Sequence, residues 1–404
     1  MKNKLINIVR TAVGVMLFSS VASAATTIHI KSVEQRWPWN NKVDITYKVT
    51  GGQDVSQSKF YRIVFTTVID GVTYTIDGNS IGASADDNEH TVTWTAPDGV
   101  RCADCTMSAA IYEANAPSGN DYMIVDLTKS SDNVAFEGLL ATQGDSDKRY
   151  AENEAYKTEK LVLRRIPAGG PYYVTSTTTK TTDRDYYVGI FPVTQRQYEL
   201  VCSDAAASSL TSENMAKPKV SVSWNSLRTA IRSTASIPEV DAENSGTFFQ
   251  RLCYKTGKKF AFDLPTDMMF ALAARAGVTT TYFWGDQMDS TKIVCKESDN
   301  ALTKVGSRAA NTWGLFDVHG NVWEWSRDNF SGKTYHSSNF VSRSDVFTPY
   351  YREVENDLHT WLGGHSYNMA STQVYFQLDR CAGDVGKAAI ANNTVGFRVS
   401  VVME

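Results

Sequence analysis

The stretch from Asn311 to Asp328, NTWGLFDVHGNVWEWSRD, constrains the fold of this chain more than any other. Three tryptophans and two glycines share it with the carboxyl side chains of Asp317 and Glu324. In an extended chain, side chains alternate between two faces, so the indoles of Trp323 and Trp325 lie opposite Glu324. We expect the indoles to enter a core and the glutamate to meet backbone carbonyls, an arrangement that suits a hard cation.

Further short motifs follow in an order that resembles the formylglycine-generating enzyme family, the sulfatase-modifying factors. The central stretch is similar to that family's usual GLYDMxGNVWEW pattern. The other motifs are RRIPAG at 164–169, YVGIFPVT at 187–194, PKVSVSW at 218–224, LPT at 264–266 with AARAG at 273–277, FWGD at 283–286, GG at 363–364 and GFR at 396–398. The resemblance covers about residues 160–402. It implies an α+β fold of the irregular C-type-lectin-like kind.

The first 24 residues have the pattern of a secretory signal peptide. Three cations precede an apolar run at 12–18, and Ala22-Ser23-Ala24 provides a small-residue cleavage site. The run is much shorter than the ~20 residues that a membrane-spanning helix needs. We therefore expect a secreted, periplasmic or cell-surface protein with no transmembrane segment after signal removal.

The charge balance excludes two classes of partner. The formal net charge of the whole chain is −4, and removal of Lys2, Lys4 and Arg10 with the signal makes it −7. No basic tract remains, whereas nucleic acids and anionic membranes call for clustered Lys and Arg. We expect neither as a partner.

Residues 25–128 show short alternating strands separated by turn signals, which predicts an all-β sandwich of immunoglobulin type. An Asp70-Gly71 pair marks a hairpin. The expected strands are 42–49, 61–69, 72–76, 90–95, 107–112 and 122–127. Residues 129–159 are polar with little periodicity and are expected to form a linker to the family-like domain at 160–404.

Three short helices are expected in the second domain. Thr194 caps the first, at 194–201, Ser223 begins the second, at 224–231, and Thr266 caps the third, at 266–276. A threonine-rich tract at 175–182 indicates an exposed loop or an edge strand.

Six cysteines lie after the signal, an even number that favours disulfides in an exported chain. Cys102 and Cys105 form a lone CxxC, which favours a local disulfide over a metal site, a redox site or free thiols. The connectivity of the other four stays open, with Cys202 to Cys253 and Cys295 to Cys381 as one possible pairing.

The resemblance implies a calcium site within the central stretch. The family's ligands are an acidic or amide side chain, two backbone carbonyls and a glutamate, which map onto Asp317, Gly320, Val322 and Glu324. Calcium requires hard oxygen ligands at such close spacing. The alternative is that both acidic side chains only accept hydrogen bonds from backbone amides.

The same resemblance argues against copper. The family's enzymes oxidise a sulfatase cysteine to formylglycine with molecular oxygen and a copper ion held by two cysteines, which lie shortly after the double glycine. Here Asn368 or Met369 and Gln373 or Val374 occupy those places. Because Cu(I) prefers thiolate ligands, we expect no copper and no catalytic residues.

The six histidines are scattered, without HxxxH or HExxH spacing, so non-haem iron is not expected either. For His319, inside the central stretch, a hydrogen-bonded core or surface role is favoured over metal ligation.

The predicted function is binding by a pseudoenzyme that lacks the catalytic cysteine pair. Its candidate ligand-binding residues are Trp361, His365, Tyr367 and Asn368, and a protein, a peptide or a carbohydrate could be the ligand. The alternative is an active formylglycine-generating oxidoreductase, or a related protein-modifying enzyme, with metal ligands elsewhere.

Overall fold

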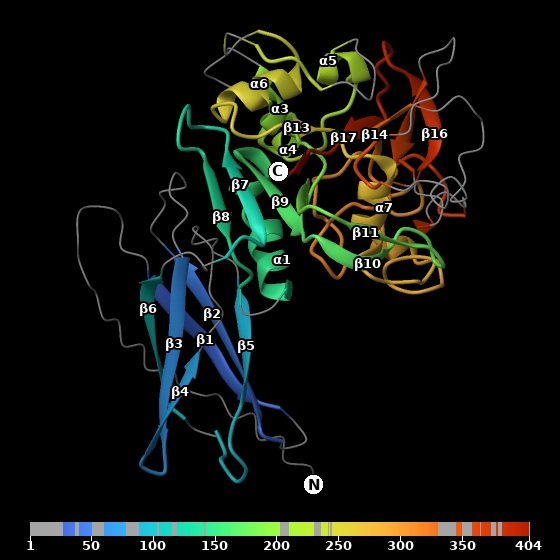
Figure 1. Ribbon diagram of the computed structural model, residues 1–404. Helices are drawn as coiled ribbons and strands as arrows, with labels where there is room; N and C mark the ends of the chain where they lie inside the picture. The colour runs from blue at the N-terminus through green and yellow to red at the C-terminus, as the bar shows by residue number, and fades with distance from the viewer. Residues whose placement is uncertain are drawn as a thin grey trace. The chain divides into compact units, whose positions relative to one another are not determined.

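The computed structural model describes two compact units (Figure 1). The first comprises residues up to 117 together with 140–153, and the second comprises 118–139 and 154 onward. The described residues are 27–36, 40–50, 60–77, 89–102, 105–114, 119–140, 143–202, 210–229, 236–240, 242, 245–329, 345–349, 358–363, 365–372, 377–378 and 382–403.

The first unit is built from two three-stranded antiparallel sheets. One has the strand order β1-β2-β5 and the other β4-β3-β6. Their bounds are β1 Thr27–Gln35, β2 Lys42–Thr50, β3 Phe60–Ile69, β4 Val72–Asp77, β5 His90–Thr95 and β6 Met107–Ala114. The helix α1, Gln143–Glu152, is grouped with this unit. The all-β region expected from the sequence is therefore present.

Alternating side chains of these strands form one apolar core. Val43, Ile45 and Tyr47 of β2 are fully buried, and Ile63 and Phe65 of β3 join them. The predicted hairpin is confirmed, because the turn at residues 70–71 has positive φ angles and connects β3 to β4. The alternation of apolar and polar residues in the sequence agrees with the strand pairing in the structure, because one face of each strand is buried.

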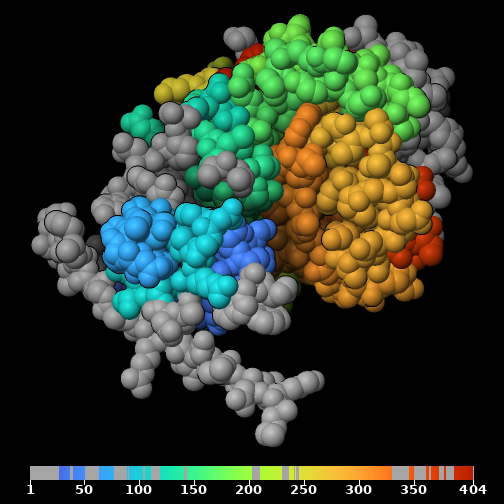
Figure 2. Space-filling view, turned by 90° about the horizontal axis from the view of Figure 1, so that it is seen from below, coloured from blue at the N-terminus to red at the C-terminus, as the bar shows by residue number. Residues whose placement is uncertain are grey.

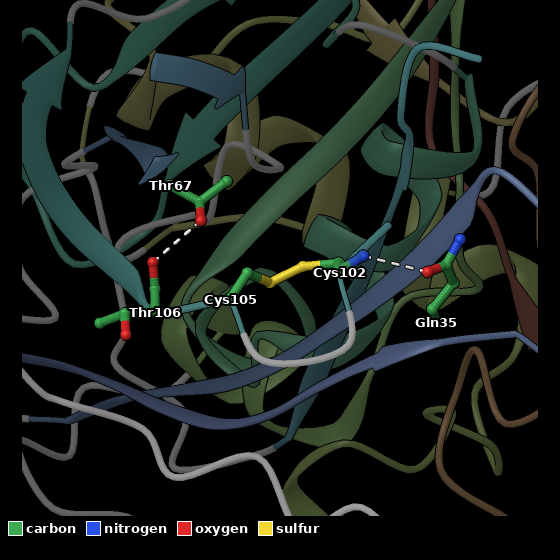
Figure 3. Close-up of a disulfide and its surroundings, with 5 residues drawn as sticks. All are labelled: Gln35, Thr67, Cys102, Cys105 and Thr106. Carbon is green, nitrogen blue, oxygen red and sulfur yellow. Dashed lines mark hydrogen bonds between the residues drawn. A yellow bond between two sulfur atoms is a disulfide. The ribbon is translucent and has the colours of Figure 1, made fainter. Parts of the chain in front are cut away.

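The predicted local disulfide between Cys102 and Cys105 is present (Figure 3). The Cys102 N–H donates to the Gln35 side-chain oxygen at 3.1 Å, and the Thr67 hydroxyl donates to the Thr106 carbonyl at 2.9 Å. These contacts tie the segment before β6 to β1 and β3.

The second unit contains a six-stranded sheet, a four-stranded sheet and a two-stranded ribbon. Their strand orders are β13-β18-β12-β9-β7-β8, β16-β15-β14-β17 and β10-β11. The bounds are β7 Tyr122–Asp126, β8 Val134–Glu137, β9 Lys160–Ile166, β10 Gly169–Tyr173, β11 Thr179–Thr182, β12 Tyr186–Gly189, β13 Phe262–Asp263, β14 Trp323–Asn329, β15 Leu358–Leu362, β16 Ala382–Lys387, β17 Val395–Phe397 and β18 Ser400–Val402. The threonine-rich tract supplies β11, so its prediction as an edge strand is confirmed.

Short helices pack on these sheets. They are α2 Ala155–Thr158, α3 Gln195–Cys202, α4 Ser212–Met215, α5 Trp224–Arg228, α6 Phe248–Lys255, α7 Asp267–Arg275 and the 3-10 turn η1 Ser290–Lys292. The three predicted helices are present as α3, α5 and α7, but α5 ends at Arg228 rather than at the predicted residue 231, because Thr229 has a φ of +74°. The Thr266 side chain accepts from the Met269 N–H, and α5 begins with a capping box at Ser223.

Residues 122–137 differ from the prediction. They form β7 and β8 of the six-stranded sheet, where β7 pairs with β9, rather than a sandwich strand and the start of a linker. The polar composition of this stretch misled the sequence interpretation, because some of its polar residues are buried. The Asn133 amide donates to the Lys255 carbonyl at 3.0 Å, and the Thr128 hydroxyl donates to Asp126 at 2.6 Å.

The segment between α7 and β14, residues 276–322, is irregular apart from the 3-10 turn η1, and it forms much of the orange surface on the face seen in Figure 2. Its buried side chains form two main clusters, one around Trp325 and Phe397 and one around α7. Within the described residues, no helix has the length and apolarity needed to cross a membrane.

Candidate functional site

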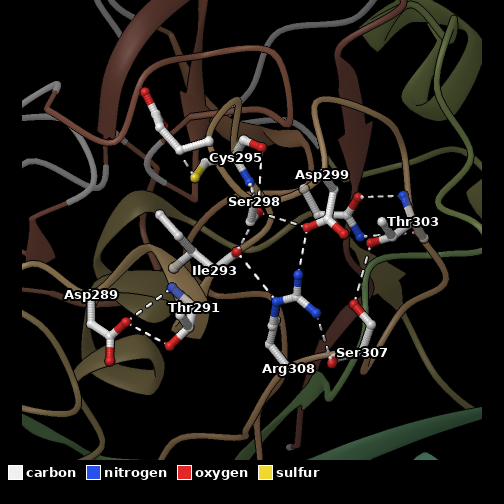
Figure 4. A network of polar contacts seen from close by, with 11 residues as sticks. Asp289, Thr291, Ile293, Cys295, Ser298, Asp299, Thr303, Ser307 and Arg308 are labelled. Carbon is white, nitrogen blue, oxygen red and sulfur yellow. Dashed lines mark hydrogen bonds and ion pairs between the residues drawn. The ribbon is translucent and has the colours of Figure 1, made fainter.

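The central stretch is held by a loop at 293–308, whose own polar contacts are shown in Figure 4. Val294 forms a bridge with Gly320, and the Asn321 side chain exchanges hydrogen bonds with the backbone of Thr303 at 3.3 Å. The loop itself is fixed by Arg308, which donates to Asp299 at 2.5 Å. These contacts position the backbone of residues 317–322 before β14 begins.

Glu324 of β14 is paired with Arg398, which follows β17. The guanidinium Nε and Nη2 lie 3.0 Å from the two carboxylate oxygens, and both side chains are fully buried. The arginine also donates to the carbonyls of Gly189 at 2.8 Å and Phe316 at 2.9 Å. The prediction that Glu324 meets backbone carbonyls is therefore wrong. An ion pair replaces them, because a buried carboxylate needs a partner that donates protons or supplies positive charge.

Asp317 is also buried, near this pair. One of its oxygens accepts from the Gly306 N–H at 2.8 Å. Burial raises the pKa of the Asp317 carboxyl to about 6, although the Gly306 N–H and the Arg398 charge act in the opposite direction. The backbone hydrogen bond agrees with the alternative interpretation of this side chain as an acceptor for a backbone amide.

The four candidate ligand-binding residues lie on β15 and in the turn after it. Trp361 pairs with Trp325 across the strands, and its ring centroid lies 6.1 Å from that of Trp323. The His365 ring lies 4.8 Å from the Trp323 ring. Trp361 and His365 are thus brought together around one tryptophan of the central stretch.

The turn itself is anchored to the central stretch by its backbone. The Tyr367 N–H donates to the Asn321 carbonyl at 2.9 Å, and the Ser366 hydroxyl donates to the Asn368 side chain at 2.7 Å. Asn368 is exposed, while Tyr367 is partly exposed. His365 is only 3% exposed and packs against Trp323. Burial lowers the pKa of the His365 imidazole to about 4, so it is neutral at pH 7.

His319 has a core position, as favoured from the sequence, but neither ring nitrogen has a hydrogen-bond partner among the described residues, so the expected hydrogen bonding is not found. It is 3% exposed and enclosed by Tyr282, Phe283 and Trp284, whose ring centroids lie 5.3–6.0 Å away. Burial lowers the pKa of its imidazole to about 3. The aromatic FWGD motif thus packs against the central stretch.

Three cysteines of the second unit are free thiols in the structure: Cys202, Cys253 and Cys295. The pairing of Cys202 with Cys253 is therefore not found, and Cys381 lies outside the described residues. Burial raises the pKa of Cys202 and of Cys253 to about 11, so neither is activated as a thiolate. The Cys295 thiol donates to Glu297 at 3.4 Å.

Residues 148–402 match the model of the sulfatase-modifying factor enzyme 1-like domain family. The chain belongs to this family. Among curated proteins it is similar to the formylglycine-generating enzyme of Mycobacterium tuberculosis, with 38% identity over 81 residues, which are 17% of this chain and 27% of that protein. It is also similar to the serine/threonine-protein kinase pkn1 of Chlamydia caviae, with 39% identity over 66 residues, 16% of this chain and 10% of that protein. The matches thus span about a quarter or less of either relative.

Two solved structures are similar to this sulfatase-modifying factor enzyme 1-like chain. PvdO from Pseudomonas aeruginosa has 15% identity and a TM-score of 0.45, over 60% of this chain and 95% of that one. CarF has 17% identity and a TM-score of 0.39, over 60% of this chain and 99% of that one. At this level of similarity, no property of either protein is assigned to this chain.

The family's calcium ligands can now be compared with the contacts in this domain. Both Glu324 oxygens accept from Arg398, an Asp317 oxygen accepts from Gly306, and the Gly320 carbonyl accepts from the Val322 N–H at 2.8 Å. Within the described ranges, no group of three or more His, Cys, Asp or Glu side chains could hold a metal ion. The chain keeps, at all four positions, the oxygen donors that calcium requires, so the calcium site stays a prediction.

Arg398 was recognised in the sequence as part of the GFR motif but was assigned no role. The sequence does contain a sign that this arginine is buried, because its neighbours Val395, Phe397 and Val399 are apolar, and all three are buried in the structure. A lone arginine in such an apolar run predicts a buried acidic partner, and Glu324 between two tryptophans is the matching carboxylate.

Proposed function

We propose that this protein is exported and binds a carbohydrate beside Gly363, without oxidising cysteine. The observation that carries the proposal is that residues 365–380 contain no cysteine. This interval corresponds to the place where the family's enzymes hold copper between two cysteines. Asn368 and Gln373 cannot supply the thiolates that Cu(I) requires. The tryptophans of the central stretch, Trp313, Trp323 and Trp325, would then serve the folding of the domain and not catalysis.

The side chains of the candidate surface favour an uncharged ligand. Trp361 and Tyr367 offer aromatic rings, Asn368 offers an amide, and the buried His365 is neutral at pH 7. A sugar ring has an apolar face that packs on aromatic side chains and hydroxyls that bond to amide and phenol groups. No formal charge is needed on either partner.

The competing function is formylglycine formation, which family membership favours. It requires thiol ligands from another part of the chain. The three described free thiols do not suit it, because two have raised pKa values and Cys295 is fully buried against Glu297. Cys381 is the nearest thiol in the sequence.

The binding prediction can be tested on a glycan array, with a peptide library as a second arm. We expect carbohydrate binding that weakens about tenfold, ~1.4 kcal/mol, in Trp361→Phe and in Tyr367→Ala. Trp284→Phe is the matched control, because it changes a partly buried tryptophan on a different loop. Binding to peptides and not to glycans would show that the ligand is a peptide. If Trp284→Phe weakened binding as much as Trp361→Phe, the surface around Trp361 would not be the binding site.

A further inference from the structure

A cavity of about 300 Å³ lies beside α3, and none of its lining residues belongs to the central stretch or to the turn at 365–369. Its volume is at the lower end of the range for cavities that hold small molecules. Four lining residues share one face of α3, since they follow the spacing i, i+3, i+4 and i+7, and two come from the segment between α3 and α5. The lining residues, all half-buried, are Gln195, Tyr198, Glu199, Cys202, Leu210 and Lys219.

Lys219 is held at this cavity by its backbone. Pro218 forms an antiparallel bridge with Thr194, just before α3, and the Lys219 N–H donates to the Val193 carbonyl at 2.8 Å. The ammonium nitrogen lies 4.8 Å from the centre of the Tyr198 ring. Within the part of the chain that the structure describes, no ion pair joins Lys219 to a carboxylate. A half-buried ammonium of this kind favours an incoming negative charge.

The other charges at the cavity leave it positive on balance. The Glu199 carboxylate is neutralised by Arg196, whose Nη1 lies 2.7 Å away. The Arg251 guanidinium donates to the Cys202 carbonyl at 3.1 Å. Burial raises the pKa of the Cys202 thiol to about 11, although the charges of Arg251 and Lys219 oppose the rise, so the thiol is uncharged at pH 7. An anion fits this field better than a neutral group does.

The remaining lining groups favour an anion with an apolar part. The Tyr198 ring is fixed by stacking on Phe248, with 5.5 Å between the ring centroids, and Leu210 adds apolar surface. We propose that this cavity binds a small organic carboxylate, with its anionic end at the Lys219 ammonium and its apolar part against Tyr198 and Leu210. The Gln195 amide offers a further donor to the carboxylate. This inference is independent of the proposed carbohydrate binding.

The first test is binding of benzoate to the full chain, measured by ligand-observed NMR at constant ionic strength. Benzamide is the uncharged probe of the same size, and inorganic phosphate is the second anion. We expect benzoate to bind about tenfold more tightly than benzamide, because only benzoate forms a charge-assisted hydrogen bond with the ammonium. Equal binding of the two, or no binding, would overturn the proposal. Phosphate binding as tight as that of benzoate would overturn the organic ligand class.

Lys219→Met removes the ammonium and keeps most of the aliphatic side chain. It should weaken benzoate binding about tenfold and leave benzamide binding unchanged. Lys217→Met is the matched control, because it removes the same charge two residues away, where the ammonium lies 2.9 Å from Glu213 and outside the cavity lining. An equal loss in the two variants would mean that the overall charge, and not this cavity, attracts benzoate.

Thiol labelling of the unsubstituted chain keeps the proposal testable if the Lys219 variant does not fold. Cys202 lines the cavity and Cys253 does not, although both are partly buried free thiols whose pKa burial raises to about 11. Saturating benzoate should slow the alkylation of Cys202 by iodoacetamide at alkaline pH severalfold, without affecting Cys253. Peptide mass spectrometry measures both rates. Slowing of both thiols, or of neither, would overturn the proposal.

Discussion

Replacement of Glu324 by glutamine should lower the free energy of unfolding of the second unit by about 3–5 kcal/mol. The pair with Arg398 is fully buried, with both contacts at 3.0 Å. The amide has nearly the same size as the carboxylate, so packing is conserved. The variant leaves the positive charge of Arg398 without a partner inside the domain. The free-energy cost of this unpaired buried charge is the main reason for the expected loss of stability. Urea unfolding followed by tryptophan fluorescence measures the effect.

The matched control is Glu213→Gln, the same substitution in an exposed pair. Glu213 lies 2.9 Å from Lys217 and its side chain is 78% exposed. Solvent screens such a pair, so the unfolding midpoint should not change. Equal effects of the two substitutions would mean that burial does not set the energy of the Glu324 pair.

Replacement of Gly320 by alanine should cost about 2–5 kcal/mol, the sum of two effects. Its φ of +80° is unfavourable for any residue with a Cβ, at about 1–2 kcal/mol. An added Cβ would also lie 2.5 Å from the Val294 carbonyl oxygen, a backbone atom that cannot move alone. Such overpacking adds about 1–3 kcal/mol.

Gly277→Ala separates these two effects. Gly277 has a φ of +88°, but a Cβ there would meet nothing within 4 Å. It should therefore show the backbone cost alone, and the difference between the two variants measures the contact with the 293–308 loop. If both variants lose the same stability, that contact contributes nothing.

The sequence predicted most of the fold because its local signals agree with the packing. The Asp70-Gly71 pair, the Thr266 and Ser223 caps and the alternation in β2 each satisfy a local backbone or burial requirement. It failed at β7 and β8, where β7 pairs with β9 of the second unit and the buried Asn133 donates to the carbonyl of Lys255, 122 residues away. Such distant contacts leave no periodic pattern in the chain.

The structure brings two of the candidate ligand-binding residues together, but the sequence did not predict the partner of Glu324. Trp361 and His365 do meet at Trp323, because Gly363 and the turn at 365–369 return the chain to the central stretch. The partner of Glu324 was missed, since 74 residues separate it from Arg398.

The most direct test of the central claim is an assay for formylglycine. The purified chain is given copper, oxygen and a peptide with the Cys-x-Pro-x-Arg pattern, and mass spectrometry measures the aldehyde, with the mycobacterial relative as positive control. We predict an unchanged cysteine, because no cysteine lies between residues 364 and 380. Aldehyde formation would contradict the claim: if Cys381→Ser abolished it, Cys381 would be catalytic, and if it persisted in that variant, the chemistry would run on other ligands.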